Sequence, residues 1–486
     1  MSECKTVQVN RLMIAGMTSG SGKTTLTCAY LRCLQKKGFD LESYKCGPDY
    51  IDPMFHKKAF GIESRNLDIF FMGEERLKAS VAKAQDSYAV IEGVMGLYDG
   101  NDVTSVAGSC YEVATVTSTP IVLVVNAGKV GRTIISMIKG VLEDDEKKLI
   151  KGIILNNITG KFYEMLFPEL KKSLAVSRPD VKMLGFFPKT KGIDFESRHL
   201  GLKLPNESEE TDKKITIASE VFEENIDIDA MIEIMQSAED IRIAASAINT
   251  NDSLNPKSAL CSETSSAPSR LGADLTLAVA YDDAFCFYYR DNIEMFEERG
   301  VKIKYFSPLE DSTVPDDADG LLLGGGYPEL YLEKLSNNKP MLESIKALID
   351  KNIPSLAECG GFMYLGKSIE DDKGNVYETV GAYDGICKYS GKLVRFGYMQ
   401  IEESNSKDSL ASTMKGLKGH EFHYYDSDMN GETCIAKKPF RDVNWKCIVN
   451  HKNGIWGFPH FYYGSNPEFI DSFIMKMREV KDGKLQ

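Results

Sequence analysis

Short apolar runs that alternate with stretches of helical length are the feature that most limits the fold of this chain. Between about residues 10 and 190 these runs include RLMIAG, YAVIEG, PIVLVVNA, KGIILNN and VKMLGFFP. Their Val, Ile and Leu residues do not alternate with polar ones, as expected of strands buried on both faces of a parallel sheet. The pattern predicts a doubly wound α/β domain with helices on both faces of its sheet.

A second α/β series follows a segment of different composition. Residues 243–270 are rich in Ser, Ala, Asn and Thr and contain almost no large apolar residues, which is typical of a linker. Apolar runs resume at LTLAVAY (275–281) and continue through GLLLGGGYPE and IPSLAECGGFMYL. We therefore expect two α/β domains, at residues 1–242 and 271–486, joined by this linker.

Charge and cysteine usage narrow the class of protein. The 58 basic and 71 acidic residues give a net charge of -13, which argues against a nucleic-acid partner because such binding needs clustered Lys and Arg. Eleven cysteines, none in a C-x-x-C pair, suit a reducing compartment better than disulfides or structural zinc. The polar start MSECKTVQVNRL and the lack of an eighteen-residue apolar run lead us to expect a cytoplasmic protein without a membrane partner.

The segment MIAGMTSGSGKTTLT (13–27) predicts a phosphate-binding loop. An apolar strand leads through Gly and Ser residues to Gly22, Lys23 and Thr24 at the start of a helix. Backbone N–H groups and the helix N-terminus would face the anion, and the lysine would reach the outer phosphates. The spacing G-x-x-x-x-x-G-K-T is one residue longer than the usual pattern. A turn that uses glycine for geometry alone is the alternative.

Carboxylates follow two further apolar strands. Glu92 ends the run YAVIE, with Asp99 in the Gly-rich loop behind it, and Asp49 and Asp52 lie in YKCGPDYIDP. A phosphate site of this type needs an acid at a strand end to hold Mg²⁺ against the phosphates. For the two Asp residues, capping of backbone N–H groups in a turn is the alternative.

Taken together, these segments resemble the amidoligase domain of the cobyrinate a,c-diamide synthase family. The similarity rests on AGMTSGSGKTT, KCGPDYIDP, IEGVMGLYDG, GIILNN and ESRHLGL, and this family shares the longer phosphate loop with dethiobiotin synthetases. The resemblance implies a P-loop NTPase-like sheet that performs ATP-dependent amidation of the a and c acetate carboxylates of a corrinoid. It also implies a carboxyl-phosphate intermediate, because phosphorylation turns a carboxylate into an acylating agent.

The resemblance extends to single residues. The candidates for ATP binding are Gly20, Ser21, Gly22, Lys23, Thr24, Thr25 and Asn156, the last of these near the adenine. The candidates for Mg²⁺ are Thr24, Asp52 and Glu92, and those for the substrate carboxylates are Asp49, Asp99, Arg198 and His199. ATP and Mg²⁺ are thus the expected cofactors. A solvated Arg198 beside a packed His199, and an Asn156 that only caps its strand, are the alternatives.

The second half contains the elements of a cysteine nucleophile site. In IPSLAECGGFMYLG an apolar strand runs into Cys359 and then into a helical segment, a sharp turn that presents a nucleophile in other α/β enzymes. The helix N-terminus is expected to lower the pKa of the thiol. His460 in WGFPHFYYGSNPE is the candidate base, and His420 and His423 in GHEFHYY are the alternatives.

A glycine-rich segment completes this second pattern. Backbone N–H groups of Gly325, Gly326 and Gly360 are the candidates for an oxyanion hole. Over about residues 275–470 these elements resemble the class I glutamine amidotransferase domain of cobyrinate and cobyrate synthases. The resemblance implies a glutamyl thioester on the cysteine and proton transfer by the histidine. Many class I relatives orient that histidine with a Glu two residues later; this chain has Tyr462, so the third member stays open.

The combined interpretation is a fused amidoligase and glutaminase that uses glutamine, ATP and cobyrinate. A nickel-sirohydrochlorin a,c-diamide synthase is the alternative with the same chemistry. A P-loop regulatory ATPase with a non-catalytic second domain is the alternative from another class, and it predicts no requirement for Cys359. GHEFHYY and VRFGYMQ are interpreted as structural segments or as part of a domain contact. The oligomeric state stays open, a homodimer included.

Overall fold

The computed structural model describes residues 4–193, 197–198, 201–202, 208–244, 271–405 and 409–483. The chain divides into two compact units, Met1–Pro256 and Lys257–Gln486. The predicted linker lies outside the described residues except for its first two, which end strand β11 (Ile241–Ala244). Because β11 pairs antiparallel with β1 (Cys4–Val7), regular structure of the first unit extends to Ala244, beyond the predicted domain end at 242.

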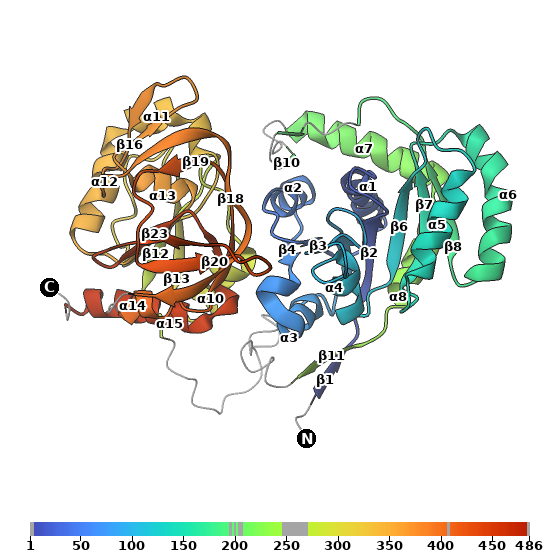
Figure 1. The fold of residues 1–486 in the computed structure, drawn as a ribbon, viewed down its shortest axis with the longest axis horizontal. Coiled ribbons are helices and arrows are strands. Elements are labelled where there is room, and N and C mark those ends of the chain that lie inside the picture. The colour runs from blue at the N-terminus through green and yellow to red at the C-terminus, as the bar shows by residue number, and fades with distance from the viewer. Residues whose placement is uncertain are drawn as a thin grey trace. The chain divides into compact units, whose positions relative to one another are not determined.

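The first unit is built on a parallel sheet of seven strands (Figure 1), in the order β4-β3-β5-β2-β6-β7-β8. These strands are β2 (Asn10–Gly16), β3 (Leu41–Cys46), β4 (Ser64–Leu67), β5 (Tyr88–Glu92), β6 (Ile121–Asn126), β7 (Ile150–Asn156) and β8 (Lys182–Phe187). Every pairing in this sheet is parallel. The carboxyl ends of the strands therefore share one edge, where ligands bind in sheets of this kind.

Helices cover both faces of this sheet, as predicted. They are α1 (Lys23–Lys36), α2 (Ile51–Phe60), α3 (Ile69–Ala82), α4 (Cys110–Val116), α5 (Thr133–Glu143), α6 (Gly160–Ser177), α7 (Ser208–Asn225) and α8 (Ile228–Gln236). Leu12, Met13, Ile14 and Ala15 are consecutive in β2, and none has exposed surface. Because successive side chains of a strand point to opposite faces, both faces must be covered.

The second unit contains a sheet in the order β13-β12-β14-β15-β23-β22. Its strands are β12 (Thr276–Ala280), β13 (Lys302–Phe306), β14 (Gly320–Leu323), β15 (Ser355–Glu358), β22 (Val449–His451) and β23 (Gly454–Gly457), of which β22 alone is antiparallel to its neighbour. Its helices are α10 (Arg290–Glu298), α11 (Leu332–Asn337), α12 (Lys339–Asp350), α13 (Gly360–Leu365), α14 (Ser409–Ser412) and α15 (Pro467–Lys481). The predicted α/β class is confirmed for this unit too.

A second, mostly antiparallel sheet in this unit was not expected from the sequence. It contains β16 (Ser368–Glu370), β17 (Val376–Glu378), β18 (Ile386–Ser404), β19 (Lys418–Ser427), β20 (Cys434–Lys437), β21 (Asn444–Cys447) and β24 (His460–Tyr462). The chain passes from β23 in the first sheet to β24 in the second within three residues. His460 therefore lies where the two sheets meet.

Among the described residues, no helix is both long and apolar enough to cross a membrane. The nine cysteines whose side chains are described are buried free thiols.

Candidate active site

The phosphate loop of the first unit leads directly into helix α1. Gly22 precedes the helix with a left-handed φ of 92°, a conformation that glycine adopts at little cost. The side-chain amide of Asn156, at the end of β7, donates to the backbone oxygen of Ser21 at 2.8 Å. A Cβ at Gly22 would lie 2.2 Å from that amide nitrogen, so the contact also requires glycine. Asn156 thus holds the loop, and its contact with adenine stays a prediction.

The lysine of this loop points toward the segment after β5. Lys23 Nζ donates to the backbone oxygen of Met95 at 2.5 Å, and a Cβ at Gly16 would lie 3.2 Å from the same nitrogen. Burial and the positive charge of Lys45 lower the pKa of Lys23. Gly20 and Ser21 precede it in the loop and Thr25 follows it in the first turn of α1, and their contact with phosphate stays a prediction.

A buried lysine joins the acids at the carboxyl edge of the sheet. Lys45 Nζ lies 2.5 Å from Asp52 Oδ2 and 2.8 Å from Glu92 Oε1, and all three side chains are almost fully buried. Thr24 Oγ1 donates to Glu92 Oε1 at 2.5 Å. His56 Nε2 lies 3.4 Å from Glu92 Oε2. Residues that come from β3, α1, α2 and β5 therefore meet at one point.

Burial and charge set the protonation of this cluster. Burial opposes the charge on Glu92, but Lys45 and His56 outweigh it and hold the pKa of Glu92 well below its usual range. Burial likewise opposes the charge on Lys45, and Glu92 and Asp52 raise its pKa. Burial and then the Glu92 charge raise the pKa of Asp52 to about 8. At neutral pH the cluster is thus an ion pair of Lys45 and Glu92 beside a largely protonated Asp52.

The oxygens of Thr24, Asp52 and Glu92 are hard donors of the type that Mg²⁺ prefers. They already face one cation, the ammonium of Lys45, so their arrangement suits positive charge. Within the described parts of the chain, no three His, Cys, Asp or Glu side chains gather as a metal cluster. The two carboxyl groups and the hydroxyl nevertheless fit a Mg²⁺ ion that takes its other ligands from phosphates and water, since a bound cation would favour the ionised form of Asp52.

The four residues predicted for the substrate carboxylates lie in different environments. Asp49 Oδ1 accepts hydrogen bonds from the backbone N–H groups of Ile51 and Asp52 at 2.8 and 3.1 Å, so it caps the start of α2. Asp99 Oδ2 accepts from Gly96 N at 2.8 Å and shapes the loop after β5. These contacts match the capping alternative. Of the remaining two residues, Arg198 belongs to β9 (Ser197–Arg198). His199 lies outside the described residues.

Lys45 and His56 were missed by the sequence analysis. Lys45 carries the clearer signal, because a lysine near the end of a buried strand needs a carboxylate partner. His56 carried no such signal, since its position beside Glu92 follows from the packing of α2 against β3.

In the second unit Cys359 lies at the sharp turn between β15 and α13. Its φ of 46° is left-handed, as in the strained turns that present nucleophiles. Its backbone N–H donates to Gly457 O at 2.8 Å, which ties the turn to the end of β23. Burial, then the charges of Glu329 and Glu421, raise the pKa of the Cys359 thiol, whereas the Gly360 N–H lowers it. The predicted lowering of this pKa by the helix N-terminus is therefore present but is outweighed by burial.

The predicted oxyanion glycines lie beside this turn. A Cβ at Gly360 would lie 3.3 Å from the backbone nitrogen of Gly326, so the two glycine segments adjoin. The Gly361 N–H donates to Gly324 O at 2.9 Å and fixes their spacing. A Cβ at Gly325 would lie 2.2 Å from Cε1 of His460, so the imidazole packs directly on this glycine. The structure thus brings the predicted base to the predicted oxyanion segment.

His460 is a buried histidine whose ring stacks on that of His420, with centroids 5.1 Å apart and an angle of 18°. Burial, then the neighbouring His420 and His423, lower the pKa of His460. A neutral imidazole can accept a proton from a neutral thiol. Tyr462, two residues later, donates from its hydroxyl to Asp291 Oδ2 at 3.0 Å.

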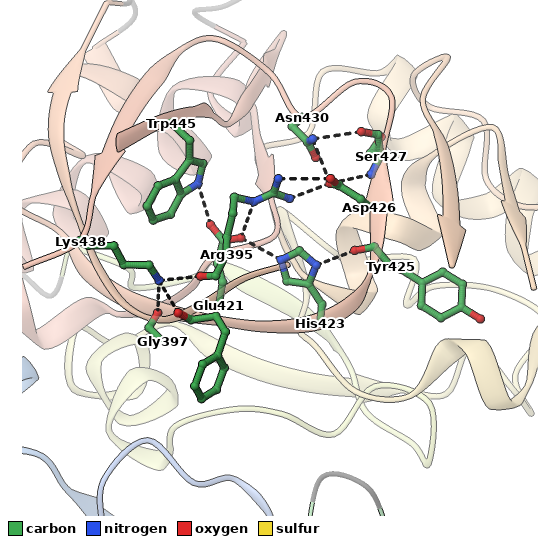
Figure 2. A network of polar contacts seen from close by, with 11 residues as sticks. Arg395, Gly397, Glu421, His423, Tyr425, Asp426, Ser427, Asn430, Lys438 and Trp445 are labelled. Atoms are coloured by element: carbon green, nitrogen blue, oxygen red, sulfur yellow. Dashed lines mark hydrogen bonds and ion pairs between the residues drawn. The ribbon is translucent and has the colours of Figure 1, made fainter. Parts of the chain in front are cut away.

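Figure 2 shows a polar network on β18 and β19 that contains the alternative base His423. Glu421 is fully buried and accepts from Arg395 Nε at 2.9 Å, from His423 Nε2 at 2.8 Å and from Trp445 Nε1 at 3.0 Å. His423 Nδ1 lies 2.6 Å from Tyr425 O. Both nitrogens of His423 are therefore engaged in hydrogen bonds, which favours His460 over His423 as the base.

The network also supports the segment that leads to His460. The ring of His423 stacks on Phe458 with centroids 4.0 Å apart, and the Arg395 guanidinium lies 5.5 Å from the centre of the same ring. Phe458 in turn packs edge-on against Phe362 of α13. The segments GHEFHYY and VRFGYMQ thus have a structural role, as interpreted from the sequence. Their side chains pack on Phe458, two residues before His460.

The fold and the two sites define a class of protein in which a nucleotide-binding unit is fused to a glutamine amidotransferase unit. Residues 12–202 match the CobQ/CobB/MinD/ParA nucleotide binding domain, and residues 276–457 match the CobB/CobQ-like glutamine amidotransferase domain. Curated relatives called cobyrinate a,c-diamide synthase are similar over nearly the whole chain. That of Clostridium tetani is 38% identical, over 96% of this chain and 99% of its own length. That of Methanocaldococcus jannaschii is 37% identical, with the same shares of both chains. The chain belongs to the cobyrinate a,c-diamide synthase family.

Proposed function

We propose that this protein catalyses the ATP-dependent amidation of the a and c acetate carboxylates of cobyrinate, with ammonia from glutamine, in cobalamin biosynthesis. The observation that carries the proposal is the presence in one chain of a phosphate loop with a buried Lys45–Glu92 ion pair and of a Cys359 turn packed beside His460. The relatives in Clostridium tetani and Methanocaldococcus jannaschii bear the name of this activity.

In the first unit the substrate carboxylate attacks the γ-phosphate of ATP, ADP departs, and the carboxylate becomes a carboxyl phosphate. Lys23 and the N–H groups of the loop from Gly20 to Thr25 bind the phosphates. When bound, Mg²⁺ would be held by Thr24, Asp52 and Glu92 and would neutralise charge on the transferred group. Lys45 adds a fixed positive charge at the same carboxylates. Ammonia then displaces phosphate and forms the amide.

In the second unit Cys359 attacks the side-chain amide of glutamine. His460 takes the thiol proton and passes it to the leaving nitrogen, so ammonia departs and a glutamyl thioester remains. Backbone N–H groups of Gly325, Gly326 and Gly360 stabilise the oxyanion of the tetrahedral intermediate. Water, activated by His460, then hydrolyses the thioester to glutamate.

The wider setting follows from this chemistry. The partners are small molecules, namely ATP, glutamine and the corrinoid, and the protein acts in the cytoplasm. The units correspond to an amidoligase domain at 1–242 and an amidotransferase domain at 271–486. Arg198 and His199 bind the substrate carboxylates, while Asp49 caps the start of α2 and Asp99 shapes the loop after β5.

The test compares two ammonia sources with two variants. With glutamine, Cys359→Ser abolishes amidation of cobyrinate, but with excess ammonium chloride it keeps the wild-type rate, because the thiol serves only glutamine. Lys23→Ala loses amidation with either source, while its release of glutamate continues. Nickel-sirohydrochlorin serves as the competing substrate, and amides are counted by mass spectrometry. A wild-type protein that amidates neither ring would overturn the proposal, and preference for the nickel ring would replace the substrate.

A further inference from the structure

We infer that Glu358, the residue before the nucleophile, positions His460 for proton transfer and supplies the third member of the glutaminase site. The inference rests on the proposed glutamine hydrolysis. The sequence left this member open, because Tyr462 stands where many class I amidotransferases have a glutamate.

The geometry places the Glu358 carboxylate beside the imidazole. Glu358 ends strand β15, and its Oε2 lies 4.0 Å from Nδ1 of His460. This distance is longer than a hydrogen bond, as is common at catalytic pairs before substrate binds and tightens them. Both side chains are buried, with exposed fractions of 10% for Glu358 and 2% for His460. In such surroundings a carboxylate and an imidazole interact more strongly than they would in water.

Two further contacts hold the carboxylate. The Tyr463 hydroxyl donates to Glu358 Oε1 at 2.7 Å, and the backbone N–H of Phe461 also donates to this carboxylate. Tyr463 and Phe461 directly follow His460, so the segment that carries the base also fixes its partner. With Oε1 bound to Tyr463, Oε2 is the oxygen that faces the imidazole.

Two other acids near the site are already committed. Glu421 accepts from Arg395, His423 and Trp445 in the network of Figure 2. Asp291 accepts from the Tyr462 hydroxyl. Oε2 of Glu358 instead makes its ion-pair contact with Nδ1 of His460, at 4.0 Å.

An ionised Glu358 accepts the Nδ1–H of His460 and so orients the other ring nitrogen to take the Cys359 proton. The imidazolium that forms is then paired with the carboxylate, and it returns to neutral imidazole when its proton passes to the departing ammonia. Glu358 itself exchanges no proton in this cycle, as in hydrolases where a carboxylate orients the histidine.

Burial supports a measurable pH effect, because it raises the pKa of Glu358 to about 8 against the opposing bonds from Tyr463 and Phe461. The titratable groups that face this carboxylate are His460, Tyr463, Tyr288 and Cys359. Glutaminase turnover is thus expected to rise as the pH passes about 8 and Glu358 ionises.

The test uses Glu358→Gln in the full-length protein, with glutamate release as the readout. Glutamine keeps an oxygen for the Tyr463 hydroxyl but cannot pair with an imidazolium. We expect kcat to fall by at least about 100-fold, as when an orienting acid is neutralised in a serine protease. KM for glutamine should stay within about threefold, and the rise of kcat near pH 8 should vanish. Glu378→Gln, at an exposed glutamate paired with Lys339, is the matched control. Tyr463→Phe should give a smaller loss of kcat.

Three outcomes would overturn the inference: a Glu358→Gln kcat within threefold of wild type, an unchanged rise near pH 8 in this variant, or an equal loss of amidation driven by ammonium chloride. The last would show that the change damages the fold. These results are distinct from failure of the proposed function, in which the wild-type protein itself releases no glutamate. If Glu358→Gln does not fold, the kcat and pH profile of Tyr463→Phe decide, and a wild-type profile there contradicts the inference.

Discussion

Gly325→Ala tests the position of His460 with a single methyl group. The new Cβ would lie 2.2 Å from Cε1 of the imidazole, and 3.1 and 3.2 Å from its two nitrogens. Carbon atoms at van der Waals contact are about 3.5 Å apart, so the ring must move by at least about 1.3 Å. A misplacement of about 1 Å in a catalytic group can cost about 100-fold in rate, or about 2.7 kcal/mol. We therefore expect kcat/KM for glutamate release to fall about 100-fold.

The assay needs two comparisons. Amidation driven by ammonium chloride should stay at the wild-type rate, because the first unit is unchanged. Gly374→Ala is the matched control, since a Cβ there meets nothing within 4 Å and adds only the strain of a left-handed residue, about 1 kcal/mol. If Gly325→Ala retains glutaminase activity within threefold of wild type, His460 in this position is not the base and the assignment of the site is refuted.

Two further predictions concern charge and pH. Lys45→Met leaves Glu92 buried without its cation, so we expect the first unit to lose about 3–5 kcal/mol of stability. ATP-dependent amidation should be lost, whereas glutaminase activity should be unchanged. Thermal unfolding that matches wild type would contradict this prediction. Asp52 and Glu358 both have a pKa raised to about 8, above an unfolded value of about 4. Their protonated forms stabilise the fold below about pH 4, and this contribution is lost as the pH rises through about 8. Unfolding temperatures should therefore fall between pH 5 and pH 9, and less steeply in Glu358→Gln; equal slopes in both proteins would argue against the burial of Glu358.

Local patterns made much of the fold predictable. The run that becomes β2 and the glycines that lead into α1 are contiguous, so they indicate a strand, a loop and a helix without knowledge of the rest. The same holds for β15, Cys359 and α13, where one short segment contains the strand, the nucleophile and the helix start. The family resemblance then connected these segments with a known pair of activities.

Other features depend on residues that are distant in sequence. The sheet around β18 and β19 escaped prediction because β18 is mostly half-buried or exposed and lacks a continuous apolar run. The role of Lys45 became evident only from the pairing of β3 with β5, which places its ammonium beside Glu92. Glu358 looked like one residue of the cysteine motif until the pairing of β15 with β23 placed it beside His460. The thiol pKa was mispredicted for the same reason, since burial is a property of the assembled unit.

In the proposed reaction one chain transfers nitrogen from glutamine to a carboxylate activated by ATP. Its most direct test is the mass of the corrinoid after incubation of the protein with ATP, Mg²⁺, cobyrinate and glutamine labelled with ¹⁵N in the side-chain amide. We expect a product with two new amides, each carrying ¹⁵N, and no such product when ATP is omitted. Unchanged cobyrinate, or amides without the label, would contradict it.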